Sequence, residues 1–171
     1  MNNKEYKLKQ QGFTLIELLV ALGLTALVTT GLMSVFWLSH NAFIREQNQA
    51  DMQYSARHAR DILVRDIRAS KTIEVWIAQD TPVSSPQDSG SWLSLQVENN
   101  GSTQQINYYV ANNVLYRDNV SAHPNNKLPI ASNLESISFT SPKPTLVNIM
   151  INTRIDEQVY SLSSSMSRRI D

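Results

Sequence analysis

The chain has 171 residues, with 15 basic and 15 acidic side chains and no cysteine. The lack of cysteine excludes a disulfide framework, a thiolate nucleophile and a cysteine metal site. The balanced charge gives the chain no overall attraction for nucleic acid or anionic lipid.

The first 12 residues form a short, polar and basic leader. Lys4, Lys7 and Lys9 outnumber the single acid, Glu5. Basic residues before an apolar segment favour retention of that end in the cytoplasm. The rest of the chain is therefore expected to be exported.

An apolar segment follows over residues 13–38. As a helix it would extend roughly 39 Å at about 1.5 Å per residue, enough to cross a hydrocarbon core of about 30 Å. It is longer than the apolar part of a secretory signal, and residues 35–38 do not resemble a small-residue cleavage site. The segment therefore predicts a membrane anchor that carries one exported domain.

The only acid in this segment is Glu17, close to its N-terminal end. Other charged side chains cost roughly 2.5–3.5 kcal/mol at the centre of a membrane helix, so an acid here is a functional hypothesis by default. Its natural partner is the positive charge that a cut before Phe13 would create. The alternative is an acid tolerated at the membrane interface, in an uncleaved anchor.

After residue 38 the pattern becomes amphipathic. An apolar stripe recurs at spacings of three and four residues: Met52, Ala56, Ala59, Leu63 and Ile67. Such a stripe marks the buried face of a helix. Arg57, Asp61 and Arg65 step by four on the other side, in an order that favours an Asp61–Arg65 ion pair. One continuous helix over residues 13–70 is the simplest account.

The remainder of the chain predicts antiparallel strands. Alternating apolar residues indicate strands over residues 92–97, 105–110, 114–117, 134–139, 146–151 and 158–162. Leu93, Leu95 and Val97 are expected to face inward, as are Ile106, Tyr108 and Val110. Turn-forming residues at 99–102 and 112–113 predict hairpins.

Residues 80–90 and 118–133 are expected to be loops, and the prolines in residues 141–144 are expected to interrupt a strand. The predicted fold class is α+β, a long N-terminal helix packed on antiparallel β-hairpins. The predicted parts are a leader (1–12), a membrane-spanning helix (13–38), its amphipathic continuation (39–70) and a β-rich exported domain (71–171); the family resemblance described next implies that the leader is cleaved and that the first helical part can form a filament core.

The leader, the junction of Gly12 and Phe13, the sequence Thr14-Leu15-Ile16-Glu17 and the long helix resemble the class III signal of type IV pilins and pseudopilins. The resemblance implies that a prepilin peptidase cuts after Gly12 and methylates the new amine of Phe13. It maps the family's characteristic acid onto Glu17, which we expect to pair with the Phe13 amine of a neighbouring subunit.

Residues 60–68, 108–117 and 134–139 resemble the PilW-type minor pilins and the J-type minor pseudopilins of type II secretion. Major pilins usually close a C-terminal loop with a disulfide, which this chain cannot form. The implied function is a minor pilin-like subunit of type IV pilus biogenesis, in the initiating or tip complex, with no enzymatic activity. The alternatives are a J-type pseudopilin and an uncleaved single-pass adhesion or binding module.

The implied partners are prepilin peptidase, other minor pilins, the major pilin, the inner-membrane assembly platform and, before assembly, membrane lipid. The implied location is the inner membrane, with the N-terminus cytoplasmic and the C-terminal domain exported. Assembly would then move the subunit into a pilus or pseudopilus.

No cofactor, metal or catalytic site is predicted. The three histidines, His40, His58 and His123, lack metal-ligand spacing, and no hydrolase or phosphate-binding motif occurs. Four side chains offer oxygen ligands for calcium, but without a recognisable ligand loop: Asp118, Asn119, Asn125 and Asn126. A solvated loop is the expectation there.

Four arginines of the helix offer contacts to a nucleic-acid backbone: Arg57, Arg60, Arg65 and Arg68. Asp61 and Asp66 alternate with them, which instead predicts a salt-bridged helix face. No nucleic-acid partner is therefore predicted.

Overall fold

The computed structural model describes residues 12–77, 89–99, 101–121 and 127–168. The predictions for the leader (1–11), most of the loop 80–90, turn residue Asn100 and the loop residues His123, Asn125 and Asn126 lie outside these residues. The chain divides into two compact units, Met1–Arg45 and Glu46–Asp171.

One long helix, α1 (Leu15–Ala69), contributes to both units. No proline occurs from residue 13 to residue 70, and only Gly23 and Gly31 weaken the helix. The helix ends where the Ser70 hydroxyl donates to the Ile67 carbonyl at 2.7 Å. The predicted helix is therefore confirmed, with its ends within two residues of those expected.

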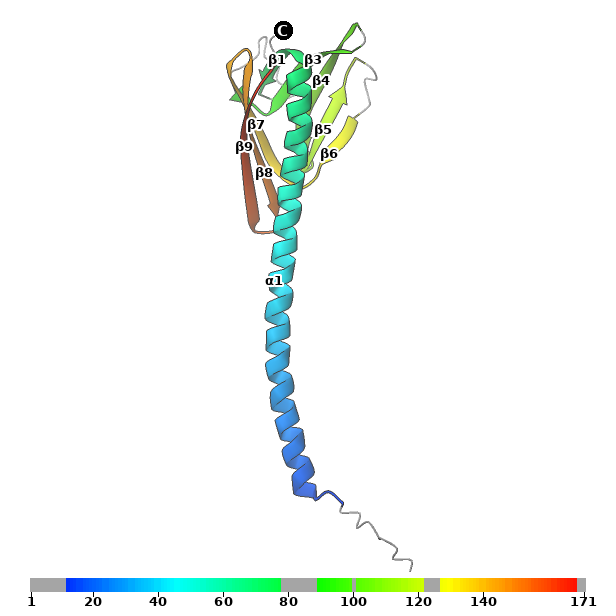
Figure 1. Cartoon of the computed structure of the whole chain (residues 1–171), viewed down its shortest axis with the longest axis vertical. Coiled ribbons are helices and arrows are strands. Elements are labelled where there is room, and N and C mark those ends of the chain that lie inside the picture. Colours follow the sequence, from blue (N-terminus) through cyan, green and yellow to red (C-terminus); the bar gives the residue numbers. More distant parts are fainter. Residues whose placement is uncertain (1–11, 78–88, 100, 122–126, 169–171) are drawn as a thin grey trace, which may run out of the picture. The chain divides into compact units, whose positions relative to one another are not determined.

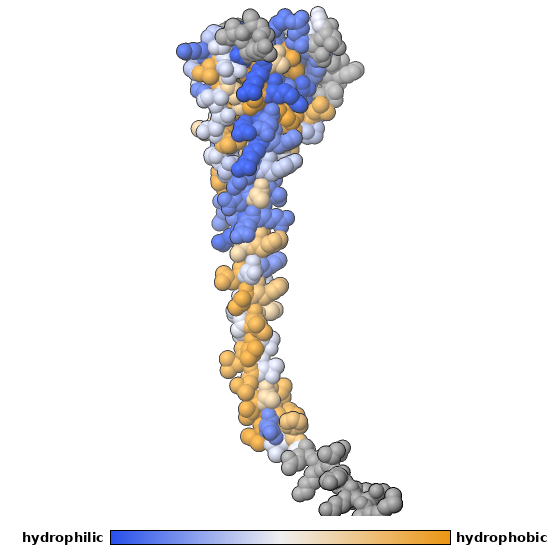
Figure 2. Space-filling model, in the orientation of Figure 1, coloured by the Kyte–Doolittle hydropathy of each residue, from blue (hydrophilic) through white to orange (hydrophobic). Residues whose placement is uncertain are grey.

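In the first unit, every described residue of α1 is exposed. Figure 2 shows that the surface of this part is mainly hydrophobic. Among the described residues, α1 is the one helix that is long and apolar enough to cross a membrane. An apolar surface of this extent is not typical of a soluble monomer, so it requires lipid or other protein chains around it.

The second unit adds two antiparallel sheets (Figure 1). The first has the strand order β1-β3-β4-β5-β6, with β1 (Ser70–Trp76), β3 (Trp92–Asn99), β4 (Ser102–Ala111), β5 (Val114–Asn119) and β6 (Lys127–Ala131). The second has the order β2-β7-β8-β9, with β2 (Ser89–Gly90), β7 (Leu134–Lys143), β8 (Leu146–Ile155) and β9 (Gln158–Ser167). The α+β class is therefore confirmed.

One hydrophobic core joins the second part of α1 to both sheets. Each residue of the predicted stripe from Met52 to Ile67 is at most 1% exposed, as expected for the buried face of the helix. The core residues from the sheets include Leu93, Leu95, Ile106, Tyr108, Ile137, Phe139, Ile149 and Ile151. The predicted inward residues Val97 and Val110 are half-buried at its margin.

The predicted turn between β4 and β5 is confirmed. Asn112 and Asn113 have φ angles of 51° and 61°, in the left-handed region that asparagine tolerates. Gly101, between β3 and β4, has a φ of 77°. These residues let consecutive strands reverse tightly, which sets the register of each hairpin.

Three strands were not expected from the sequence. β1 follows α1 directly and pairs with β3, while β2 lies at the end of the predicted loop 80–90. β6 lies within the predicted loop 118–133 and contains Pro129. Proline is tolerated there because β6 is an edge strand, where one side of the backbone needs no hydrogen-bond partner.

The expected interruption at residues 141–144 was wrong in part. β7 continues to Lys143, and the pairing register with β8 shifts between Thr140 and Lys143. The irregularity accommodates Pro142 without ending the strand. β8 and β9 are also longer than predicted, since each has 10 residues.

Candidate functional site

The predicted processing junction lies just before α1. Gly12, Phe13 and Thr14 have no regular secondary structure, and the Phe13 side chain is 84% exposed. Apart from its chain neighbours, no described residue has an atom within 4 Å of the position that a Cβ on Gly12 would occupy. The backbone at this junction is therefore open, as a protease needs in order to bring its catalytic groups close.

Thr14 and Glu17 form a capping box at the start of α1. The amide N and the Oγ1 of Thr14 donate to Glu17 Oε2 at 3.4 and 3.3 Å, and the Glu17 amide donates to Thr14 Oγ1 at 3.3 Å. This reciprocal pattern satisfies backbone N–H groups that the first helical turn leaves without partners. The Thr-x-x-Glu spacing signals such a cap, which the sequence interpretation missed.

The cap leaves part of the Glu17 carboxylate available. Both hydrogen bonds to the side chain use Oε2, and no hydrogen bond or ion pair of the described residues uses Oε1. A carboxylate has about four lone-pair positions, so it can cap its own helix and still accept hydrogen bonds from an ammonium group. The cap is therefore compatible with the predicted pairing of Glu17 with a Phe13 amine.

Hydroxyl side chains in the apolar part of α1 are satisfied within the helix. Thr25, Thr29, Thr30 and Ser34 each donate to the carbonyl four residues earlier, at 2.6–3.1 Å. A hydroxyl bonded in this way needs no water. These residues are thus suited to an apolar environment, as is the rest of the segment.

A buried polar cluster holds α1 to the first sheet. Asp66 Oδ2 accepts hydrogen bonds from Tyr108 Oη at 2.5 Å and from Arg117 Nε at 2.7 Å. Burial, followed by the negative charge and hydrogen bond of Asp66, raises the pKa of Tyr108 far above its ordinary value. Arg117 neutralises the carboxylate, and both sheet residues donate hydrogen bonds to it, as a buried charge requires.

This cluster corrects part of the predicted salt-bridged helix face. Asp66 is only 8% exposed and bonds to the sheet through Oδ2, while its Oδ1 still lies 3.8 Å from Nε of the exposed Arg65. The expected pair of Asp61 with Arg65 is also absent, because Asp61 pairs with Arg60 at 2.6 Å. The helix therefore keeps ion pairs, Arg60 with Asp61 and Arg65 with Asp66, but with other partners than expected and with one of the acids buried.

The other sequence candidates do not come together. His40 stacks on Phe36 and His58 on Tyr54, with ring centroids 6.0 and 5.9 Å apart. Asp118 is buried in β5, so the expectation of a solvated loop was wrong for that residue. In the part of the chain that the structure describes, no group of three His, Cys, Asp or Glu residues could hold a metal ion.

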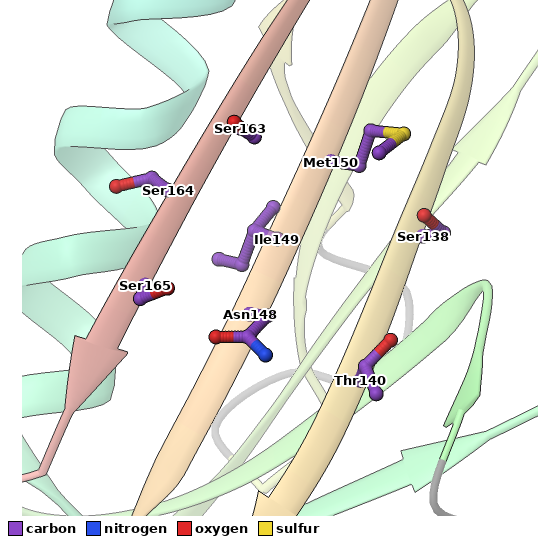
Figure 3. A pocket seen from close by; sticks show the side chains of 8 residues that line it. All are labelled: Ser138, Thr140, Asn148, Ile149, Met150, Ser163, Ser164 and Ser165. Carbon is purple, nitrogen blue, oxygen red and sulfur yellow. The ribbon is translucent and has the colours of Figure 1, made fainter.

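The outward face of the second sheet carries a shallow depression of about 360 Å³ (Figure 3). Its lining is rich in small hydroxyls and contains no charged side chain: Ser138, Thr140, Asn148, Ile149, Met150, Ser163, Ser164 and Ser165. The hydroxyls have no histidine or carboxylate among them to act as a base, so nucleophilic catalysis has no support there.

The described residues define a class of protein with one long N-terminal helix. The first part of this helix is exposed and apolar, and its second part packs on antiparallel sheets. This arrangement is consistent with a pilin fold. A family model described as the prokaryotic N-terminal methylation motif matches residues 7–33, which include Gly12, Phe13 and Glu17. No curated protein and no solved structure matches the chain.

The motif and the apolar helix together support a membrane-anchored, type IV pilin-like protein. They point to a structural subunit rather than an enzyme. A prepilin motif also implies processing by prepilin peptidase and assembly with other pilins.

Proposed function

We propose that this protein is a minor pilin-like subunit of type IV pilus biogenesis that acts in the initiating or tip complex. The observation that carries the proposal is the match to the N-terminal methylation motif over residues 7–33, at the start of a helix whose first part is entirely exposed. Such a helix is covered by lipid before assembly and by the helices of other subunits afterwards.

In this proposal, the N-terminus lies in the cytoplasm and residues 39–171 are exported. Prepilin peptidase cuts between Gly12 and Phe13 and methylates the Phe13 amine. The amine then pairs with Glu17 of a neighbouring subunit. An opposite charge nearby offsets the cost of holding a carboxylate in an apolar bundle, provided that hydrogen bonds satisfy both groups.

The minor role rests on residues 60–68, 108–117 and 134–139, which resemble PilW-type and J-type subunits. In the structure, Asp66 from the first of these segments bonds to Tyr108 and Arg117 from the second. A J-type pseudopilin of type II secretion is the second candidate function, because the same three segments also resemble that subunit. Deletion of the gene distinguishes the two, since it reduces filament number in one case and secretion in the other.

Leader processing tests the proposal directly. Intact-mass analysis of the membrane-extracted protein should show loss of residues 1–12 and the gain of one methyl group. The same chain from a strain without prepilin peptidase is the matched control and should keep its leader. Recovery of only the full-length chain from a strain with active peptidase would instead identify an uncleaved anchored module.

A further inference from the structure

The edges of the two sheets differ in how they are protected. Among the described residues the edge strands are β1, β6, β2 and β9. β6 has 5 residues and includes Pro129, and β2 has only 2 residues. β1 ends against the chain around β2, where Ser91 N donates to Ile77 O at 3.4 Å. Short length, proline and such coverage are the usual means by which proteins prevent edge pairing.

The fourth edge strand, β9, is neither short nor interrupted by proline. It has 10 residues, Gln158–Ser167, and contains no charged residue and no proline. In the described structure it pairs only with β8. A long, uncharged edge of this kind is a template on which another strand can pair.

The register identifies the backbone groups that β9 offers. Arg168 N donates to Thr145 O at 2.9 Å, just beyond the last pair of the β8–β9 ladder, Leu146 with Ser167. Hydrogen-bonded pairs alternate along an antiparallel ladder, so Ser164 and Met166 also bond to β8. The N–H and C=O groups of Ser163, Ser165 and Ser167 therefore point away from the sheet.

A groove of about 370 Å³ runs along this edge. Its lining consists of four consecutive residues of β9 and one face of α1: Ser164, Ser165, Met166, Ser167, Arg60, Asp61, Val64 and Arg68. Side chains of consecutive strand residues alternate between the two faces, so a groove that reaches all four follows the strand edge. Figure 3 shows Ser164 pointing to the side of β9 on which α1 lies.

The groove has an excess of positive charge. Arg60 is neutralised by Asp61 at 2.6 Å, whereas no ion pair of the described residues includes Arg68. Arg168 directly follows the strand, and its Nε is buried without a hydrogen-bond partner. Arg68 lines the groove and Arg168 directly follows the C-terminal end of β9, so this region is suited to carboxylates.

We propose that the edge of β9 is a docking site for an extended segment of a different protein chain, which adds a strand to the second sheet. Main-chain hydrogen bonds to Ser163, Ser165 and Ser167 supply affinity. Acidic side chains of the segment pair with Arg68 and Arg168 and fix its register.

The same features argue against a second copy of this chain as the occupant. β9 itself contains no acid, so a second β9 strand in antiparallel pairing would bring no carboxylate to Arg68. Parallel pairing would bring Arg68 and Arg168 of both copies to the same end, where like charges repel.

The test uses the full chain in its native cells, with a photo-crosslinking phenylalanine derivative at position 161, an exposed position on β9. We expect a crosslink whose partner peptide, read by tandem mass spectrometry, is an acidic segment of another protein. Ser165→Pro removes one outward N–H without removing a bond to β8, and it should lower the crosslinked product at least tenfold. Ser165→Ala keeps the N–H and should leave it unchanged.

A second pair of variants tests the charge and does not depend on how the proline variant folds. Arg68 is exposed, so Arg68→Glu should accumulate normally but lose most of the crosslink, while Arg68→Lys retains it. A crosslink to a second copy, no product at position 161, or equal crosslinking in Arg68→Glu and Arg68→Lys would overturn the proposal. Leader processing is scored on the same samples, so failure of the proposed function is seen separately.

Discussion

Glu17 combines two roles that substitution can separate. Its carboxylate caps α1 through Thr14, and its negative charge is the proposed partner of a Phe13 amine. Glutamine serves in a capping box as glutamate does, but it carries no charge. The two roles therefore predict different outcomes for neutral substitutions at this position.

We expect Glu17→Gln and Glu17→Ala to reduce incorporation into the filament or its initiating complex to a similar degree, because both remove the charge. Export and leader cleavage should continue in both variants. Thr14→Ser, which keeps the capping hydroxyl and leaves Glu17 intact, is the control. Immunoblots of sheared filaments and of membranes measure incorporation, and wild-type incorporation of Glu17→Gln would show that the cap alone is needed.

Tyr108 links stability to alkaline pH. Burial and the neighbouring Asp66 raise its pKa above the value of about 10 for free tyrosine. Above that pH the unfolded chain loses the phenol proton while the folded chain keeps it, so folding becomes less favourable. The contribution of this group is fully present below about pH 10 and is lost as the pH rises further.

Urea unfolding of the fragment from Ser39 onward, between pH 8 and pH 11, should therefore show a loss of stability above about pH 10. The slope from this group approaches about 1.4 kcal/mol per pH unit. Tyr108→Phe should cost about 1.5–3 kcal/mol at pH 8, since it removes a hydrogen bond to a charged group. The variant should then lose less stability on going to pH 11, and parallel curves for the two proteins would contradict this assignment.

At the scale of the element, α1 changes its surroundings along its length. Its described residues are all exposed up to Gln47, whereas the later stripe from Met52 to Ile67 is buried against the sheets. The helical repeat places apolar residues on one face only in this later part, because only there does one face meet protein. The same helix thus serves as a membrane segment and as part of a folded core.

Paired substitutions on the two faces of α1 test which face is buried against the sheets. Leu63 has no exposed surface, so Leu63→Ala should destabilise the fragment from Ser39 onward by about 2–5 kcal/mol. Arg57 lies on the exposed face, and Arg57→Ala should change stability by no more than about 0.5 kcal/mol. Urea unfolding at pH 7 measures both changes in stability. Equal losses of stability in the two variants would show that the Leu63 face is not the buried one.

For the whole molecule, the proposed role concerns stoichiometry. A subunit that meets different neighbours through different surfaces forms heterologous contacts, which can start a helical assembly. In this proposal, the edge of β9 and the apolar part of α1 are two such surfaces. Neither requires a second copy of this chain.

We therefore expect the exported fragment to be monomeric alone and to bind the exported domain of another minor pilin. In purified filaments, quantitative mass spectrometry should find this chain far below the major subunit. Deletion of its gene should strongly lower filament number or secretion while the major subunit stays in the membrane. An abundance equal to that of the principal component would rule out a minor role.

The sequence by itself was sufficient for the features that depend on neighbouring residues. The length of α1, its buried stripe, the left-handed turn at Asn112 and Asn113 and the methylation motif all follow from local patterns. A helix closes its hydrogen bonds four residues apart, and a two-residue turn needs only residues that tolerate its backbone angles. Such features can therefore be predicted before any tertiary contact is known.

Only the tertiary structure decided how the strands divide into two sheets and which charges are buried. β1 is a strand because its residues pair with β3, as Ser70 does with Val97, and β6 is a strand because β5 offers it an edge. The sequence pattern predicts that Asp66 is a surface acid, because its partners Tyr108 and Arg117 are distant in sequence and come beside it only in the folded chain. Strand pairing and charge burial join residues distant in sequence, so their partners are unknown until the chain has folded.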